Sequence, residues 1–292
     1  GGGRSWDSRF GWVRDATFTL LALLRAGYTD EAKAWREWLL RAIAGSPSQL
    51  QIMYGVSGER RLDEFELPWL SGYADSAPVR VGNAACGQFQ LDVFGEVIDA
   101  MYHAHRSGLE SSDADWRLQV ALLHFLETKW DEPDEGIWEV RGPRRQFTHS
   151  KVMAWVAFDR AVKLVENCDC EANHSLERWR KLRDKIHRQV CRRGFNKQKN
   201  AFTQFYGGEA MDASCLMLPL VGFLPPNDKR ILGTIAAIAR ELHEDGFVQR
   251  YRPSEQTLDG LPGSKGRFRP WSFVPADADH SARASTERRV PC

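Results

Sequence analysis

The sequence predicts an all-α protein built from consecutive helical hairpins. Apolar residues recur at helical spacing over residues 18–26, where Gly27 is placed to end the helix, and again over residues 30–44. The same spacing returns in three later pairs of segments, 85–105 with 113–129, 148–166 with 172–192, and 212–221 with 227–243. No segment of any length is rich in strand-forming residues, although 51–55 and 141–147 fit short loop hairpins.

Long connections join the predicted helices and carry aromatic, glycine and proline residues. They cover residues 46–83, 130–147, 194–211 and 244–267. Long loops on a rigid helical scaffold usually carry function. Consecutive hairpins fit an open solenoid or a closed toroid, and the absence of a fixed repeat length disfavours the solenoid.

Composition and charge exclude several classes of protein. Of the 292 residues 42% are hydrophobic, and 40 basic side chains against 39 acidic ones leave a formal charge of +1. With no long basic run, nucleic acid is not an expected partner. No apolar stretch approaches the roughly 20 residues of a membrane-spanning helix, and the first residues carry no apolar leader. We therefore expect a cytoplasmic protein that needs no membrane.

Neither a metal nor a nucleotide cofactor is implied by the sequence. His103 and His105 are two residues apart on a predicted helix, so they point to different faces. The chain has no glycine-rich phosphate loop and no nucleophile motif of the G-x-S-x-G type.

The segment WDSRFGWVRDATF places Arg14 and Asp15 at the mouth of the first predicted helix, beside Trp12. In one interpretation Asp15 interacts only with the helix dipole. In the other, the adjacent cationic and anionic groups bind vicinal hydroxyls of a sugar, and the indole packs on the apolar face of the ring. The residues alone leave both interpretations open.

The segment WDEPDEGIWEVRGPRR carries five carboxylates between two predicted helices. An acidic loop is usually a solvated surface, and that interpretation covers four of the five. Glu139 differs, because Ile137, Trp138 and Val140 surround it with apolar bulk that would desolvate its carboxyl, as a general acid requires. Glu139 is therefore the candidate catalytic residue, although a surface role is about equally compatible with the residues alone.

Taken together and in order, the motifs resemble bacterial members of glycoside hydrolase family 15, the glucoamylase, glucodextranase and trehalase family. WVRDATFTLLALLRAG is similar to the first-helix signature of that family, and IWEVRGPRRQFTHSKVMAWVAFDRA is similar to its proton-donor segment. QIMYGVSGER, PVRVGNAACGQFQLDVFGEV and GFVQRYRPSEQTLDGLPG resemble its long loops and the helices that follow them. The resemblance runs from Ser5 to about Phe268 and implies an (α/α)6 toroid or barrel of helical hairpins.

The resemblance also assigns roles to residues of this chain. It implies that Glu139 is the general acid of an inverting hydrolysis of α-glucosidic bonds. It implies substrate contacts for Trp12, Arg14, Asp15, Arg80, Trp138 and Arg250. No metal ligand and no cofactor are implied.

The sequence departs from the family pattern at three places. Ser8 stands where bacterial relatives usually have a tyrosine, and no β-sandwich domain precedes the helices. Beyond Phe268, where the family supplies its last helices and its general base, the resemblance stops. We expect a truncated N-terminus, a partial catalytic domain over 1–268 that is incomplete at its C-terminus, and a poorly ordered tail over 269–292. Glu255 and Glu287 are weak candidates for the missing base.

These features favour a glucoamylase-like hydrolase that releases glucose from an α-glucan or oligosaccharide. The first alternative is a trehalase of the same family, because the two activities share their chemistry and differ in the leaving-group site. The second is a truncated, inactive fragment that at most binds sugar. A helical-repeat interaction scaffold is a weaker hypothesis, because such a scaffold would need a groove instead of clustered Trp, Arg and Asp.

Overall fold

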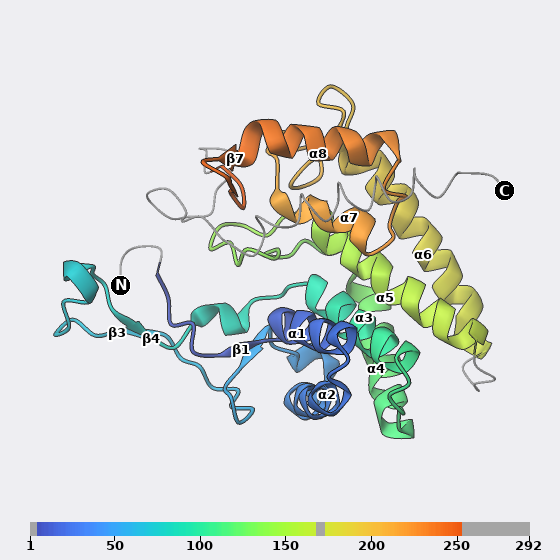
Figure 1. Ribbon diagram of the computed structural model, residues 1–292, viewed down its shortest axis with the longest axis horizontal. Coiled ribbons are helices and arrows are strands. Elements are labelled where there is room, and N and C mark those ends of the chain that lie inside the picture. The colour runs from blue at the N-terminus through green and yellow to red at the C-terminus, as the bar shows by residue number, and fades with distance from the viewer. Residues whose placement is uncertain (1–4, 168–172, 253–292) are drawn as a thin grey trace. The chain divides into compact units, whose positions relative to one another are not determined.

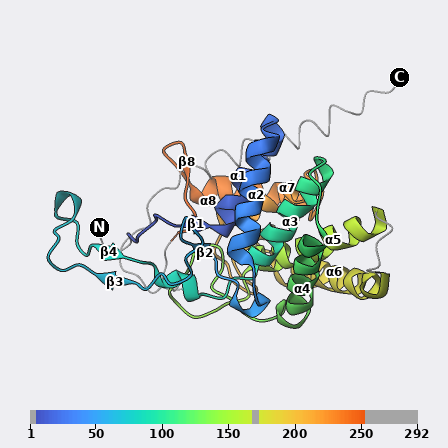
Figure 2. The same ribbon diagram turned by 90° about the horizontal axis from the view of Figure 1, so that it is seen from below.

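The computed structural model describes residues 5–167 and 173–252 and confirms the predicted all-α class (Figures 1 and 2). The helices of these residues are α1 (Val13–Ala26), α2 (Thr29–Ile43), α3 (Asp92–Arg106), α4 (Asp113–Lys129), α5 (Thr148–Asn167), α6 (Asn173–Arg193), α7 (Met217–Leu220) and α8 (Lys229–Leu242). Short 3-10 helices are η1 (Pro47–Gln49), η2 (Tyr73–Asp75), η3 (Ala84–Gly87) and η4 (Ala213–Leu216). The predicted tail over 269–292, Glu255 and Glu287 lie outside the described residues.

The loops contain short antiparallel strand pairs, in which each strand is two residues long. They are β1 (Gly11–Trp12) with β2 (Met53–Tyr54), β3 (Phe65–Glu66) with β4 (Arg80–Val81), β5 (Phe195–Asn196) with β6 (Ala201–Phe202), and β7 (His243–Glu244) with β8 (Phe247–Val248). The prediction of hairpins within 51–55 and 141–147 was wrong. Met53 and Tyr54 pair with the segment before α1, and Arg145 forms an isolated bridge with Asp134.

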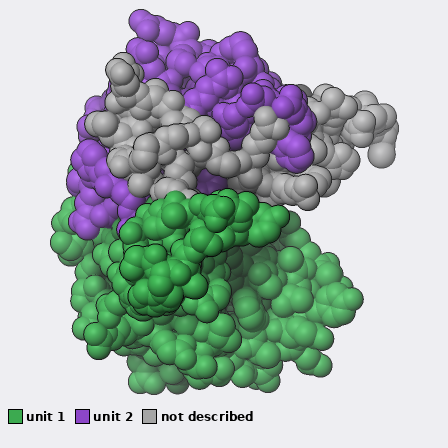
Figure 3. All heavy atoms as spheres, turned by 90° about the vertical axis from the view of Figure 1, so that its left-hand side faces the viewer, with its two compact units in different colours: residues 1–132, 153–183 green, residues 133–152, 184–292 purple. Residues whose placement is uncertain are grey.

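The chain divides into two compact units, coloured separately in Figure 3. Unit 1 consists of Gly1–Glu132 and Met153–Arg183, and unit 2 consists of Pro133–Val152 and Asp184–Cys292. Both α5 and α6 contribute residues to each unit, because two of the three boundaries fall inside these helices.

In unit 1, helix α1 packs against α2 and α3. Its buried face contains Val13, Ala16 and Leu20. The helix begins at Val13 rather than at the predicted Phe18, because β1 leads directly into it and the Val13 N–H donates to the Ile52 carbonyl at 2.9 Å. It ends at Gly27, whose φ of 84° is the left-handed conformation that commonly terminates helices.

The helix predicted over 85–105 is in fact two elements. Asn83 caps η3 by accepting a hydrogen bond from the Ala85 N–H at 3.0 Å, and the chain then becomes extended at Gln88 before α3 begins. Gln90 and Leu91 in this connection are buried. Burial of a non-helical segment therefore overrides the helical spacing of its apolar residues.

In unit 2, helix α8 packs against β6 and η4. Its buried face includes Ile231, Thr234 and Ile238. The Thr234 hydroxyl joins helix to strand, because it accepts a hydrogen bond from the Phe202 N–H at 2.9 Å and donates to the Arg230 carbonyl at 2.7 Å. The helix predicted over 212–221 is divided into η4 and the short α7, with Asp212 capping η4.

Within the described ranges, none of the helices combines the length and the apolar character needed to span a bilayer.

Gly95 in α3 lies directly against α5, and an added methyl group there would overlap the carbonyl oxygen of Met153. We expect Gly95→Ala to lower the free energy of unfolding by about 1–3 kcal/mol, although alanine is the better helix former, because backbone must move to admit it. The measurement is urea unfolding followed by circular dichroism. Gly87→Ala, where a Cβ would meet nothing within 4 Å, is the control; equal stability of the two variants would contradict the close packing.

Candidate active site

Glu139 lies in a tight turn of unit 2 between α4 and α5. Its φ of 55° is in the left-handed region, and Gly136 three residues earlier also has a positive φ of 70°. The Glu139 N–H donates to the Gly136 carbonyl at 3.1 Å, and the Val140 N–H donates to the Glu135 carbonyl at 3.3 Å. A left-handed conformation costs a residue such as glutamate about 1–2 kcal/mol, so the surrounding contacts must hold it.

The residues beside Glu139 are buried, as their apolar character predicts. Ile137, Trp138 and Val140 are exposed by 3%, 7% and 9%, whereas Glu139 itself is half-buried. The carboxyl is therefore bordered by apolar groups and remains partly open to solvent. This is an environment in which a carboxyl can transfer a proton to a bound molecule.

The buried carboxylate of Asp212 accepts hydrogen bonds that hold this turn. The Trp138 indole Nε1–H donates to both carboxylate oxygens, at 2.8 and 3.0 Å. Asp212 also accepts hydrogen bonds from the Ser214 N–H at 2.8 Å, from the Ser214 hydroxyl at 2.6 Å and from Gln204 Nε2 at 2.9 Å. Burial raises the pKa of Asp212 above its usual value, and the hydrogen bonds oppose that shift.

Arg250 also lies at this turn. Its guanidinium carbon is 5.0 Å from the centroid of the Trp138 ring, within the range of a cation–π contact. The Arg250 carbonyl accepts a hydrogen bond from the Ala213 N–H at 2.9 Å. In unit 2 the structure thus brings together Trp138, Glu139 and Arg250, three of the residues predicted from the sequence.

In unit 1 the predicted sugar-binding residues follow one another at the start of α1. Trp12 is the N-terminal cap residue, and Arg14 and Asp15 lie in the first turn. The Arg14 guanidinium lies 3.9 Å from the Asp15 carboxylate and 4.0 Å from that of Asp92. The side chain of Asp15 is 60% exposed and that of Arg14 is 13% exposed, so Asp15 reaches solvent more freely.

Three acidic side chains line one face of α3, at helical spacings of four and three residues. They are Asp92, Glu96 and Asp99, and all three are buried. Burial, followed by the charges of Asp92 and Asp99, raises the pKa of Glu96 well above its usual value, against the opposing charge of Arg14. The Thr17 hydroxyl of α1 lies 3.2 Å from a Glu96 carboxyl oxygen. Burial therefore favours the protonated form of the Glu96 carboxyl.

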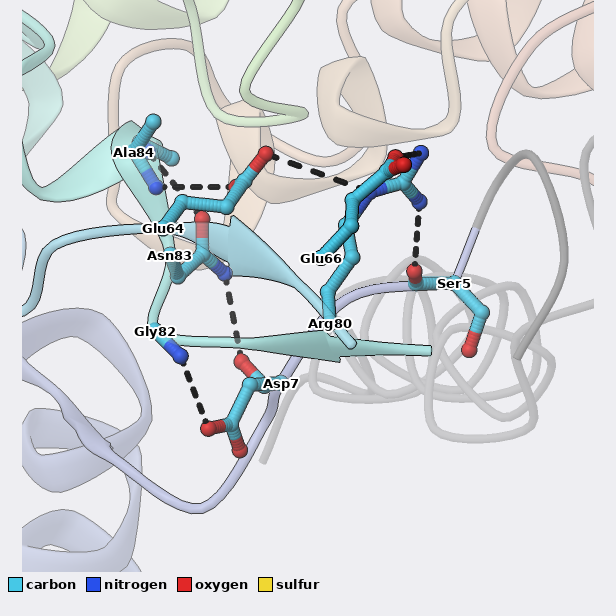
Figure 4. Close-up of polar contacts among 9 residues, drawn as sticks. Ser5, Asp7, Glu64, Glu66, Arg80, Gly82, Asn83 and Ala84 are labelled. Carbon is cyan, nitrogen blue, oxygen red and sulfur yellow. Dashed lines mark hydrogen bonds and ion pairs between the residues drawn. The ribbon is translucent and has the colours of Figure 1, made fainter. Parts of the chain in front are cut away.

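Arg80, the fourth predicted residue of unit 1, ties the N-terminal segment to strand β4 (Figure 4). Its guanidinium donates to the Ser5 carbonyl at 2.9 Å and to Glu66 at 3.3 Å, and it lies 5.7 Å from the centroid of the Trp6 ring. The side chain is only 14% exposed. These contacts give Arg80 a structural role that does not depend on substrate.

The same segment is held a second time by Asp7. Its carboxylate accepts the Gly82 N–H at 3.1 Å, and its carbonyl accepts Asn83 Nδ2 at 3.3 Å (Figure 4). A hydrogen bond from the Arg9 side chain is the main reason that the pKa of Asp7 falls to about 2. The residues that lead into Trp12 are thereby fixed against the β3–β4 pair.

Within residues 5–167 and 173–252, no group of three or more His, Cys, Asp or Glu residues is arranged to hold a metal ion.

Comparison with known proteins decides the family. The model of the glycosyl hydrolases family 15 matches residues 3–272. The chain belongs to glycosyl hydrolase family 15. This match extends from the first-helix motif through the proton-donor segment and confirms the resemblance found in the sequence.

Two curated relatives of this family 15 chain are trehalases. The trehalase of Mycolicibacterium smegmatis is 44% identical over 275 residues, which are 93% of this chain and 41% of that protein. The trehalase of Thermoplasma volcanium is 35% identical over 269 residues, which are 92% of this chain and 42% of that protein. The chain thus spans about two-fifths of the length of these relatives.

Solved structures confirm the fold of the family 15 chain. A glycosidase variant in complex with glucose matches it with a TM-score of 0.73 at 15% identity, over 95% of this chain and 71% of that one. A wild-type glycosidase matches with a TM-score of 0.72 at 16% identity, over the same shares. The helical-hairpin, toroid class predicted from the sequence is therefore confirmed.

Sequence reasoning missed two buried carboxyls, Asp212 beside the candidate residues of unit 2 and Glu96 beside those of unit 1. Asp212 entered only as the start of a predicted helix, and Glu96 only as a member of an apolar-rich segment. The available signal was a carboxylate set among apolar residues, as in MDASCLM and VFGEVI, where an acidic residue is not expected without a partner.

The raised pKa of Glu96 predicts a pH-dependent effect of its replacement. In the unfolded chain Glu96 ionises near the usual 4.5, whereas in the folded chain it keeps its proton to higher pH. Its contribution to stability is therefore complete below pH 4.5 and is lost as pH rises. We expect Glu96→Gln to raise Tm at pH 7, by about 2–4 °C for each kcal/mol gained.

This gain should shrink as the pH is lowered towards 4.5. The measurement is calorimetry from pH 4.5 to 8, with Glu110→Gln, an exposed site, as the control. A Tm difference for Glu96→Gln that does not change with pH would contradict the raised pKa of Glu96.

Proposed function

We propose that this family 15 chain hydrolyses the α-glucosidic bond of trehalose, with Glu139 as the proton donor. The observation that carries the proposal is the placement of Glu139, a half-buried carboxyl on a rigidly held turn and bordered by buried apolar side chains. The substrate is supported by the names of the relatives, because proteins 44% and 35% identical to this chain are trehalases.

The chemistry is an inverting hydrolysis. Glu139 gives its proton to the bridging oxygen while the bond from that oxygen to the anomeric carbon breaks. A water molecule forms a new bond to the same carbon from the opposite face and loses a proton to a second carboxylate, which inverting enzymes place about 6.5–9.5 Å from the acid. The products are two glucose molecules. The general base is not assigned to a described residue, since Glu255 and Glu287 lie outside the described ranges.

The remaining candidate residues have roles that suit their chemistry. Arg14 and Asp15 offer charged hydrogen-bonding groups to vicinal hydroxyls, and the Trp12 indole offers an apolar face to the sugar ring. In unit 2, Trp138 and Arg250 lie beside Glu139 and offer an indole face and a cation to a bound sugar. Arg80 has an indirect role, because it holds the segment that precedes Trp12 in the chain.

Glucoamylase-like release of glucose from maltooligosaccharides is the second candidate. The sequence favoured it over trehalose, and the names of the relatives now reverse that order. Both reactions use the same donor and differ in the leaving group. A third possibility, an inactive chain that only binds sugar, remains a separate outcome of the test.

Replacement of Glu139 by Gln tests the proposal. The amide keeps the size of the side chain but has no acidic proton to give, so we expect kcat on trehalose to fall about 10²–10⁴-fold. The measurement is glucose release from trehalose, maltose and maltotetraose by the full-length protein. We expect kcat/KM to be highest for trehalose.

Glu132→Gln is the matched control, because Glu132 lies in the same acidic loop and its carboxylate pairs with Lys129 at 2.8 Å. This control should keep wild-type activity. Comparable activity of the Glu139→Gln variant and the wild type would refute the donor assignment. A preference for maltotetraose would replace trehalose by the second candidate, and sugar binding without glucose release would establish the third.

A further inference from the structure

The burial of Asp212 needs an explanation beyond helix capping. Both Asp212 and Asp228 are cap residues that accept the N–H of the residue two positions later, at 2.8 Å in each case. Asp228 is near the surface, with a side chain 20% exposed, whereas Asp212 is only 2% exposed. Burying a carboxylate is costly unless several donors surround it. A cap therefore accounts for one hydrogen bond of Asp212 but not for its burial.

The other hydrogen bonds of Asp212 show what the burial achieves. Its distinctive partner is the indole of Trp138, whose N–H lies between the two carboxylate oxygens at 2.8 and 3.0 Å. The half-buried indoles of Trp35 and Trp38 donate to backbone carbonyls, each at 2.7 Å. The buried indole of Trp179 donates to one carboxylate oxygen of Glu127 at 2.7 Å. The Trp138 N–H differs in that it lies within hydrogen-bond distance of both oxygens of its acceptor.

Fixing the Trp138 indole also fixes the backbone that leads into Glu139. The two residues share a peptide bond, and Glu139 has the left-handed φ of 55° that its own side chain disfavours. The backbone hydrogen bonds of the turn, at 3.1 and 3.3 Å, are of ordinary or long length. The Trp138 indole N–H adds contacts of 2.8 and 3.0 Å between this turn and Asp212.

The segment of Asp212 also supports Arg250. The Ala213 N–H donates to the Arg250 carbonyl, while the Arg250 guanidinium lies over the ring of Trp138. The buried Asp212 carboxylate therefore orients the Trp138 indole, and through it Glu139. The same segment also orients Arg250, which is stacked on the indole.

From these contacts we infer that Asp212 is a positioning residue for the reaction: through Trp138 it sets the direction of the Glu139 carboxyl. This inference rests on the proposed function, because it assigns Glu139 the role of proton donor. Asp212 is not itself the general base, since its carboxylate is closed to solvent and already accepts hydrogen bonds from Trp138, Ser214 and Gln204.

The test is the Asp212→Asn variant of the full-length protein, assayed on trehalose. The amide has nearly the same shape, but its NH₂ group must face donors from Trp138, Ser214 or Gln204. A small misplacement of a catalytic group can cost about 10²-fold in rate. We expect kcat to fall by about that factor while KM changes less than about threefold. Asp228→Asn, which makes the same change at the other cap residue, should leave both constants unchanged.

A double-mutant cycle separates positioning from general damage. Trp138→Phe removes the indole N–H and leaves Ser214 and Gln204 on Asp212. If Asp212 acts through Trp138, the double variant should be no slower than the more impaired single variant. Multiplying losses would overturn the inference. If the Asp212→Asn variant fails to fold, the Trp138→Phe variant alone tests the inference. A wild-type kcat in the Trp138→Phe variant would show that the hydrogen bond does not position Glu139.

The two proposals fail in distinguishable ways. Wild-type activity on trehalose, together with equal activity of the Asp212→Asn and Asp228→Asn variants, would overturn only the role of Asp212. A wild-type protein that cleaves neither trehalose nor maltooligosaccharides would overturn the proposed function, and the role of Asp212 with it.

Discussion

The hydrogen bonds between Trp138 and the buried carboxylate of Asp212 are the contact on which the candidate active site of unit 2 depends. The turn between α4 and α5 contains two residues with positive φ, and only one of them is a glycine. Such a turn has little local preference for its conformation, so long-range contacts must impose it. Asp212, 74 positions after Trp138 in the chain, supplies such a contact.

Unit 1 places acidic groups in its interior by a different means. Asp99 keeps a lowered pKa despite the opposing effect of burial, because His103 and Arg160 stabilise its charge, with Arg160 at 2.6 Å. Glu96 accepts a hydrogen bond from the Thr17 hydroxyl, and its pKa is raised well above the usual value by burial and by the charges of Asp92 and Asp99. Asp212 and Asp99 thus lie among donors or beside a cation, whereas the charged form of Glu96 is disfavoured, as the cost of burying a bare charge requires.

Much of the fold could be predicted from the sequence, because helical periodicity and end signals are local. Gly27 ends α1 where the pattern places it, and α4 matches its predicted bounds of 113–129. The break between η3 and α3 could not be predicted, since the burial of Gln90 and Leu91 is a tertiary effect. Neither could the pairing of Met53 with Trp12, which joins segments distant in the chain.

The candidate site could be predicted only in part. Glu139 stood out through its apolar neighbours, and Arg14 and Asp15 through their place at a helix start. Asp212 could not be paired with Trp138 from the sequence, because nothing local links the two residues. The proposal of trehalose over maltooligosaccharides rests on the names of relatives, since both substrates present an α-glucosidic bond to the donor.

The role of Glu139 as proton donor is tested most directly with α-glucosyl fluoride. Fluoride leaves without being protonated, so this substrate needs water activation but no acid. If Glu139 donates the proton, the Glu139→Gln variant should hydrolyse α-glucosyl fluoride within about tenfold of the wild-type rate, while its loss on trehalose remains about 10²-fold or more. Equal losses on the two substrates would contradict proton donation by Glu139.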